Sequence, residues 1–148
     1  MTINERLQPN SSVMLELASD FRAVLESLDW GCIGKSGEFP KGCCHYASGF
    51  LIDFLESRGV VGARLVRGHY EPDIDNAAHY WVEVSGLAID VTADQFSFCD
   101  EPVIVQPASE WHEPNFSFAR MDVDRTYHSS NPQLCALRIS LEENLTRG

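Results

Sequence analysis

The chain has 148 residues, of which 44% are hydrophobic and 22% charged, as is typical of one soluble globular domain spanning residues 1–148. Its net charge of −11, from 22 acidic and 11 basic residues, disfavours nucleic acid as a partner, because an acidic surface repels phosphate groups. There is no long uncharged apolar run for a membrane span and no signal-peptide pattern at the start, so we expect a cytoplasmic protein that binds no membrane.

Two helices are predicted in the first part of the chain. Asn10 and the serines after it can cap a helix that continues to residue 29 and carries apolar residues at helical spacing. The glycine-rich residues 30–41 are expected to form a loop. A second helix is predicted from Cys44, with apolar residues every three or four positions, and Gly59 ends it.

The rest of the chain is predicted to be mostly strands. Residues 63–66 favour a strand, residues 71–77 a loop, and residues 79–84 and 87–92 the two strands of a hairpin. Residues 103–105 and 116–121 are weaker strand candidates, expected at sheet edges, and residues 131–141 favour a last helix. This order predicts an α+β fold in which N-terminal helices pack on an antiparallel β-sheet.

The hairpin register follows from a two-residue turn at Ser85 and Gly86. Val82 then lies opposite Ile89, and one face of the hairpin is wholly apolar or aromatic. The other face carries His79, Trp81, Glu83, Ala88, Asp90 and Thr92. His79 and Asp90 are diagonal neighbours on that face, about 7–8 Å apart at the backbone and within side-chain reach. A slip of one residue in register would move Asp90 to the opposite face.

Five cysteines occur, at positions 32, 43, 44, 99 and 135. Their odd number and irregular spacing, without a C-x-x-C pair, argue against a disulfide framework and against a standard structural zinc site. We therefore expect free thiols, most of them small core residues. Cys43 and Cys44 stand apart, because unpaired amides and the helix dipole at a helix start favour a thiolate. Both also fit the simpler interpretation of half-buried thiols.

A cysteine nucleophile needs a base and a group that orients the base. His79 and Asp90 supply that pair on one hairpin face, although each alone is more often a structural residue. A metal site formed by Cys43, Cys44, His45 and His79 is disfavoured, because adjacent cysteines cannot easily face the same ion. From the residues alone, either cysteine of the pair remains a candidate.

Taken in order, these motifs resemble the transglutaminase-like superfamily of papain-like thiol enzymes. They read GCC at 42–44, GFLIDFLESRG at 49–59, ARLVRG at 63–68, HYWVEV at 79–84 and DVT at 90–92. The resemblance covers roughly residues 39–96 and is to the minimal core of small bacterial members. It implies a papain-like fold and a triad of Cys44, His79 and Asp90, because Gly42 then takes the Gly-x-Cys position. No cofactor and no metal are expected.

The family resemblance also implies an activity. It implies a cysteine-dependent hydrolase or acyl-transfer enzyme that acts on amide bonds of a peptide or protein through a thioester. The Cys44 amide is the expected oxyanion donor, with Cys43, Trp30 or Gln95 as candidate support, although for Trp30 we favour a hydrophobic plug over the second helix. The alternative is an inert binding or regulatory module on the same fold. An arylamine acetyltransferase-like enzyme has the same Cys-His-Asp order but is expected to be longer and to use coenzyme A.

Overall fold

The computed structural model describes residues 10–30, 39, 43–70, 78–121 and 132–147. In chain order its helices and strands begin with α1 (Ser11–Ser27), α2 (Cys44–Ser57), β1 (Arg64–Tyr70), β2 (His79–Val84) and β3 (Leu87–Asp90). They continue with η3 (Ala93–Gln95), β4 (Ile104–Pro107), α3 (His112–Asn115), β5 (Phe116–Met121) and α5 (Pro132–Arg147). The predicted α+β class is confirmed.

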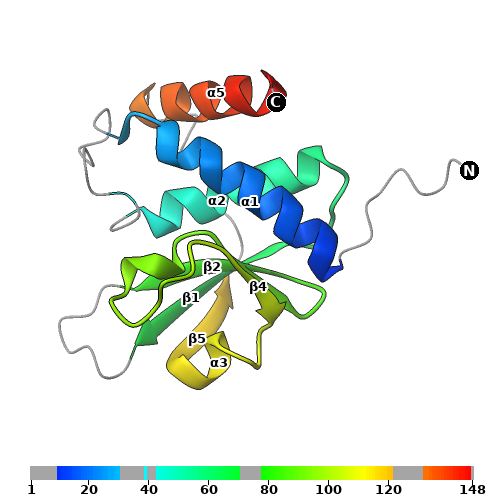
Figure 1. Cartoon of the computed structure of the whole chain (residues 1–148), viewed down its shortest axis with the longest axis vertical. Coiled ribbons are helices and arrows are strands. Elements are labelled where there is room, and N and C mark those ends of the chain that lie inside the picture. The colour runs from blue at the N-terminus through cyan, green and yellow to red at the C-terminus, as the bar shows by residue number, and fades with distance from the viewer. Residues whose placement is uncertain (1–9, 31–38, 40–42, 71–77, 122–131, 148) are drawn as a thin grey trace, which may run out of the picture.

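The five strands form one antiparallel sheet in the order β4-β3-β2-β1-β5. The two strands with the weakest sequence signal, β4 and β5, are its edges, as predicted. Helices α1 and α2 cover one face of the sheet, and α5 lies on the far side of α1 (Figure 1). Helix α3 lies beside β5, away from the other helices (Figure 1).

Helix α1 begins where the sequence predicts. The Oδ1 atom of Asn10 accepts a hydrogen bond from the Val13 amide at 2.9 Å, so Asn10 is the N-cap. A stripe at three- and four-residue spacing faces the core and is fully buried: Met14, Ala18, Phe21 and Leu25. The helix ends at Ser27, slightly before the predicted residue 29.

Helix α2 is the most buried helix segment near the sheet. It starts at Cys44 as predicted, and most of its surface is buried because it lies between β1 and β2 on one side and α1 on the other, while His45 and Glu56 share its exposed face. Ser48 donates to the Tyr80 carbonyl at 3.2 Å and so ties the helix to β2. Gly59, with a φ of 85°, takes the left-handed conformation that lets the chain leave the helix.

Strand β1 extends to Tyr70, beyond the predicted residue 66. It pairs with β2 on one side and β5 on the other, so backbone hydrogen bonds rather than apolar alternation define its length. Gly68 lies on it under the Trp81 ring, where an added Cβ would meet ring atoms at 2.6 and 2.7 Å. A side chain at this position is therefore excluded by close packing.

The β2–β3 hairpin has the predicted register. Ser85 and Gly86 have φ values of 50° and 81°, the double positive φ of a two-residue hairpin turn. Val84 pairs with Leu87 and Val82 with Ile89, and the apolar face packs against α1 and α2 in the main core. Strand β3 stops at Asp90, before the predicted residue 92, because the chain turns there into η3.

The second half of the chain differs most from its prediction. Strand β4 is shifted to Ile104–Pro107, α3 was not predicted, and α5 continues past residue 141 to Arg147. Strand β5 has the predicted bounds. Apart from Trp30 and Phe39, the predicted 30–41 loop and the 71–77 loop lie outside the described residues.

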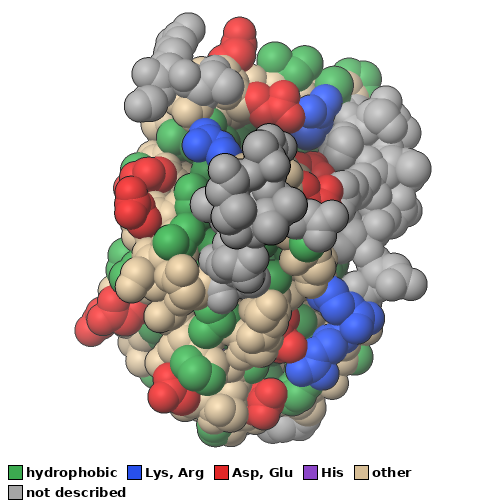
Figure 2. Space-filling view, turned by 90° about the vertical axis from the view of Figure 1, so that its right-hand side faces the viewer, with side chains coloured by type: hydrophobic (Ala, Val, Ile, Leu, Met, Phe, Trp, Pro, Cys, Tyr) green, Lys and Arg blue, Asp and Glu red, His purple; other side chains and the backbone are tan. Residues whose placement is uncertain are grey.

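The surface carries the acidic excess of the sequence. On the face in Figure 2, acidic side chains are scattered among apolar and neutral ones, and basic side chains form only small groups. Within the described residues, no helix combines the length and apolarity needed to cross a membrane. Cys43, Cys44, Cys99 and Cys135 form no disulfide with one another, and Cys32 lies outside the described residues.

Candidate active site

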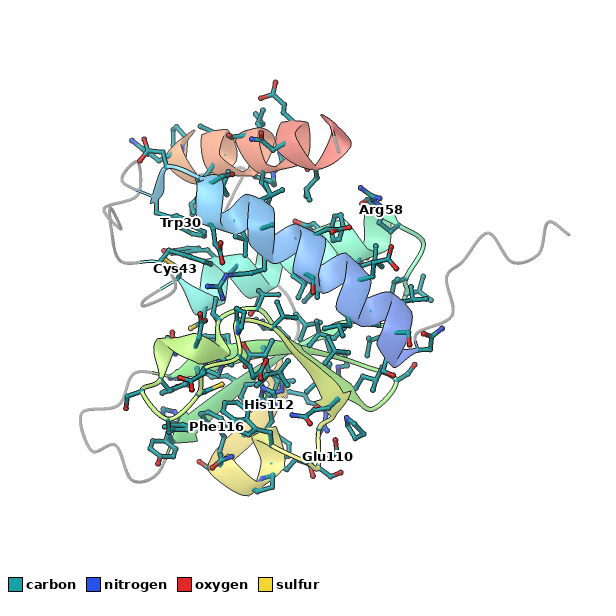
Figure 3. All side chains as sticks on the ribbon, viewed as in Figure 1. Trp30, Cys43, Arg58, Glu110, His112 and Phe116 are labelled. Carbon is teal, nitrogen blue, oxygen red and sulfur yellow. The ribbon has the colours of Figure 1, made fainter. Side chains whose placement is uncertain are left out.

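Cys44 is the first residue of α2, and Cys43 is its N-cap. Both are nearly or fully buried, but they face different surroundings: Cys43 belongs to the core shared with α1, whereas the Cys44 sulfur lies 3.7 Å from the Ala78 carbonyl oxygen, next to β2. Figure 3 shows Cys43 close to Trp30 on the helix side of the molecule. The first-turn amides of α2 have no intrahelical acceptors, and they surround Cys44 with positive partial charge.

His79, the first residue of β2, makes the central contact of the site. Its Nε2 donates to Asp90 Oδ2 at 2.6 Å, and both side chains are fully buried. Asp90 ends β3, and its Oδ1 accepts the Thr92 amide at 2.9 Å. The structure thus brings together the two residues that the hairpin register placed as diagonal neighbours.

His79 and Asp90 each stabilise the charged form of the other. Burial lowers the pKa of His79, but the Asp90 carboxylate and the neighbouring Cys44 sulfur outweigh burial and raise that pKa to about 9. Burial raises the pKa of Asp90, but the charge of His79 and the hydrogen bonds of two histidines hold it well below its ordinary range. At neutral pH the pair is therefore an imidazolium and a carboxylate.

The second ring nitrogen of His79, Nδ1, is not bonded to Asp90, because Nε2 makes that contact. Cys44 lies near enough to His79 to help raise the pKa of that ring, while its thiol donates to the Ala78 carbonyl oxygen at 3.7 Å. The amide nitrogen of Gln95 also lies 2.9 Å from Nδ1. An amide can present its N–H to a neutral ring or its oxygen to a protonated one, so Gln95 accommodates both charge states.

The three residues expected to support the oxyanion, Gln95, Trp30 and Cys43, lie in different surroundings. Gln95, in η3, joins the site. Trp30 is buried, stacks on Phe39 with ring centroids 5.2 Å apart, and donates its indole N–H to the Leu25 carbonyl at 2.9 Å. That N–H is committed to the backbone, so Trp30 is a plug rather than an oxyanion donor. Cys43 contributes its carbonyl oxygen, which accepts the Ala47 amide at 2.9 Å inside α2.

Sequence reasoning missed His112. Its Nε2 lies 2.8 Å from Asp90 Oδ2, the same oxygen that His79 contacts, and its side chain is fully buried. Figure 3 shows His112 beside Phe116, on the side of the strands where α3 lies. Its segment has no helical or strand period, and only the long-range placement of α3 brings it to Asp90. The one available signal was a histidine within an aromatic stretch.

The described residues include one group with metal-ligand chemistry, His79, Asp90 and His112, whose ligand atoms lie within 4.8 Å of one another. It differs from the cysteine-containing set considered from the sequence. Two ligands about 2.1 Å from one ion are roughly 3.0–3.4 Å apart in octahedral or tetrahedral geometry. The observed separations of 2.6 and 2.8 Å are shorter, as expected of hydrogen bonds. As the side chains lie in this structure, the three residues form a hydrogen-bonded cluster.

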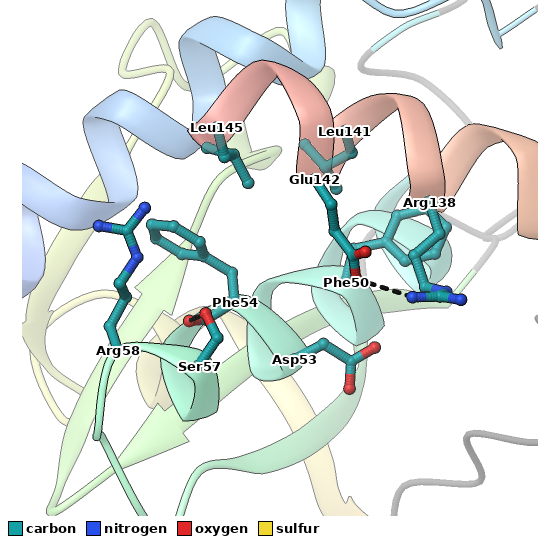
Figure 4. A pocket seen from close by; sticks show the side chains of 9 residues that line it. All are labelled: Phe50, Asp53, Phe54, Ser57, Arg58, Arg138, Leu141, Glu142 and Leu145. Carbon is teal, nitrogen blue, oxygen red and sulfur yellow. Dashed lines mark hydrogen bonds and ion pairs between the residues drawn. The ribbon is translucent and has the colours of Figure 1, made fainter. Parts of the chain in front are cut away.

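A cavity of about 580 Å³ lies between α2 and α5 (Figure 4). Phe50, Phe54, Leu141 and Leu145 form its apolar wall, and Arg138 and Glu142, paired at 2.7 Å, lie at one end. The lining residue on α2 nearest to Cys44 in sequence is Phe50, six residues on or about 9 Å along the helix, and Cys44, His79 and Asp90 are not among the residues that line the cavity. The cavity is therefore separate from the triad.

Comparison with protein-family models, with curated proteins and with solved structures finds no match for this chain. The resemblance to the transglutaminase-like superfamily, and the papain-like fold it implies, thus stay predictions from sequence motifs. The α+β architecture and the contacts of Cys44, His79 and Asp90 do not depend on that resemblance.

Proposed function

We propose that the chain is a cysteine-dependent hydrolase or acyl-transfer enzyme that acts on amide bonds through a thioester on Cys44. The observation that carries this proposal is the buried His79–Asp90 pair at 2.6 Å, which lies beside Cys44 at the start of α2 and has Gln95 at its second ring nitrogen. That combination supplies an acid–base group, its orienting carboxylate and a nucleophile.

In the first half-reaction the Cys44 thiolate attacks the amide carbonyl carbon, and the π pair of the carbonyl moves to its oxygen. Amides at the start of α2 stabilise that oxyanion. As the carbon–nitrogen bond breaks, the leaving amine takes the Nδ1 proton of His79. The products of this half are a free amine, a neutral His79 and a thioester.

In the second half-reaction neutral His79 takes a proton from water through Nδ1, and the hydroxide formed attacks the thioester. The carbon–sulfur bond breaks, sulfur leaves as the thiolate, and the acid product departs. The thiolate–imidazolium pair is restored. An amine in place of water gives transamidation, and we favour a peptidase or amidase because no second amine site is marked.

The substrate we infer is a peptide or protein, and no cofactor is required by these steps. A nucleophilic Cys44 must stay reduced, which suits a reducing compartment such as the cytoplasm.

Iodoacetamide labelling tests the proposal. The native protein is treated briefly at pH 7, and the labelled cysteine is located by peptide mass spectrometry. We expect Cys44 to react at least about tenfold faster than Cys43, Cys99 or Cys135. The H79Q variant should lose that advantage, whereas C43A, the matched neighbour control, should keep it. Equal slow labelling of all cysteines contradicts the proposal.

The second candidate is an inert binding or regulatory module. It is favoured by burial, since Cys44 is only 6% exposed and His79 and Asp90 are 0% and 1% exposed. It predicts that Cys44 labels no faster than an ordinary buried thiol and that H79Q changes nothing. The same labelling experiment therefore distinguishes the two functions.

A further inference from the structure

Asp90 Oδ2 accepts two hydrogen bonds from two different histidines. His79 Nε2 lies 2.6 Å from it and His112 Nε2 2.8 Å, while Asp90 Oδ1 accepts the Thr92 amide at 2.9 Å. A carboxylate only accepts, so both histidines carry their proton on Nε2. The oxygen that orients His79 is thus shared with a residue from a distant segment.

His112 is held rigidly for this contact. The Trp81 ring lies 4.6 Å from its ring and the Trp111 ring 4.7 Å, measured between centroids. Among the described residues, His112 Nδ1 has no hydrogen-bond partner, so the ring's only polar contact there is with Asp90. An apolar side chain would fill this buried position equally well, so the single polar contact of His112, with the triad carboxylate, indicates a role beyond packing.

We propose that His112 is a positioning residue of the triad, which holds Asp90 and shares the charge of the oxygen that faces His79. This inference rests on the proposed function, since it assigns a role within that site. His112 touches neither the thiol nor the scissile bond, and it acts through Asp90 alone.

Because His79 and His112 share Asp90 Oδ2, the direction in which His112 shifts the pKa of His79 can be stated. A carboxylate oxygen that already accepts one N–H attracts a second proton donor less strongly, whether the first donor is neutral or charged. His112 therefore weakens the hold of Asp90 on the His79 proton. Without it, His79 keeps its proton to higher pH and delivers it to the leaving amine more slowly.

Several titratable groups face this cluster and enter its pH response. His79 on β2 faces Cys44 on α2 and Asp90 on β3. Asp90 in turn faces His112 on α3 and lies near Cys99, on the segment before β4. A pH titration must therefore observe His79 itself rather than a summed signal.

The test is a ¹⁵N NMR titration of the histidine rings in the full chain, with H79Q identifying the His79 signal. Variant H112F removes the donor but keeps a ring, and H112Q keeps an N–H at the position of Nε2. We expect the His79 midpoint to rise by about half to one pH unit in H112F and to stay within about 0.3 unit in H112Q. An unchanged or lowered midpoint in H112F overturns the inference.

Two further readouts keep the test decisive. If H112F does not fold, H112L takes its place, with the same expectation. In the unmodified protein the His112 signal must show a protonated Nε2, and a ring protonated only on Nδ1 overturns the inference without any variant. These midpoints are measured without substrate, so they stand even if Cys44 proves unreactive and the proposed function fails.

Discussion

Gln95 is the residue whose role the structure changes most. Its amide reaches His79 Nδ1 at 2.9 Å, and Cys44 also neighbours that ring, so we expect Gln95 to lie within reach of the oxygen of a carbonyl attacked by Cys44. An amide N–H beside a developing oxyanion stabilises the transition state, whereas alkylation of a thiolate forms no oxyanion. Comparing substrate turnover with thiol alkylation therefore distinguishes an oxyanion donor, which affects only turnover, from a residue that activates the thiol, which affects both.

We expect Q95A to lower turnover of a small activated amide or ester at Cys44 by about a hundredfold or more. Iodoacetamide labelling of Cys44 should stay within about threefold of the unmodified protein. Steady-state kinetics and labelling rates are measured on the same preparation. Equal losses in both rates would show that Gln95 acts on the thiol instead.

At this scale the sequence predicts what lies close along the chain or on one hairpin. His79 and Asp90 follow from strand alternation and a two-residue turn, and Cys44 follows from its place at a helix start. His112 could not be predicted, because no local pattern links residue 112 to residue 90. Trp30 is the opposite case, a residue that the sequence offers as an oxyanion donor. Only the structure shows that its indole N–H already donates to the Leu25 carbonyl at 2.9 Å.

Arg22 links α1 to the segment that carries Gln95. Its guanidinium bonds both carboxylate oxygens of Asp94 at 2.8 and 2.9 Å and the carbonyls of Val91 and Pro102 at 2.9 Å each. It also bonds Glu26, four residues along α1, at 2.9 Å. A buried fork of this kind fixes the start of η3 and thereby the position of Gln95.

We expect R22Q to lower the free energy of unfolding by about 2–4 kcal/mol, because Asp94 and two carbonyls lose their donor. The matched control is R138Q, which also removes an arginine paired with a glutamate four residues on, but at a more exposed site. Its cost should be roughly 0.5 kcal/mol or less. Urea unfolding measures the free energy of unfolding of both variants. Equal losses in R22Q and R138Q would contradict the role of Arg22 in holding Asp94 and the start of η3.

Gly68 gives a second prediction for an element. Its substitution by alanine places a Cβ within 2.7 Å of the Trp81 ring, so G68A should cost about 1–3 kcal/mol of unfolding free energy. In a W81F background the two colliding indole atoms are gone and Phe116 Cβ, 3.0 Å away, is the close neighbour that stays, so the added cost of G68A should fall below about 1 kcal/mol. Thermal or urea unfolding of the four proteins measures it, and an unchanged cost in that background would place the strain elsewhere.

Element boundaries were predictable where local chemistry sets them. The Asn10 cap and the Ser85–Gly86 turn are such cases, and both are confirmed. Strand β1 was predicted too short because its length comes from pairing with β2 and β5, which local alternation does not report. Helix α3, with its bounds at His112–Asn115, is too short to show a period in the sequence.

For the whole molecule, the charged pair makes stability depend on pH. The pKa of His79 is raised to about 9, above its value of about 6.5 in the unfolded chain, so its contribution is complete below pH 6.5 and is lost as the pH rises through 9. The pKa of Asp90 is lowered, so its contribution is present above about pH 4 and is lost as the pH falls. The free energy of unfolding should therefore be greatest between about pH 4 and pH 6.5.

We expect the free energy of unfolding to fall by roughly 3 kcal/mol between pH 6.5 and pH 9.5. Urea unfolding at half-unit steps measures the slope. The H79Q variant should show a much flatter curve over that range, since other groups are unchanged. A slope equal to that of the unmodified protein would assign the effect to groups other than His79.

The most direct test of the proposed function is the acyl-enzyme itself. The protein is mixed with a small aryl ester, acid-quenched within seconds, and analysed by intact mass and peptide mapping. The triad predicts one acyl group per chain on Cys44, absent in C44A, at least tenfold slower to form in H79Q, and unaffected in C43A. No adduct, an adduct on another residue, or equal rates with and without His79 would contradict it.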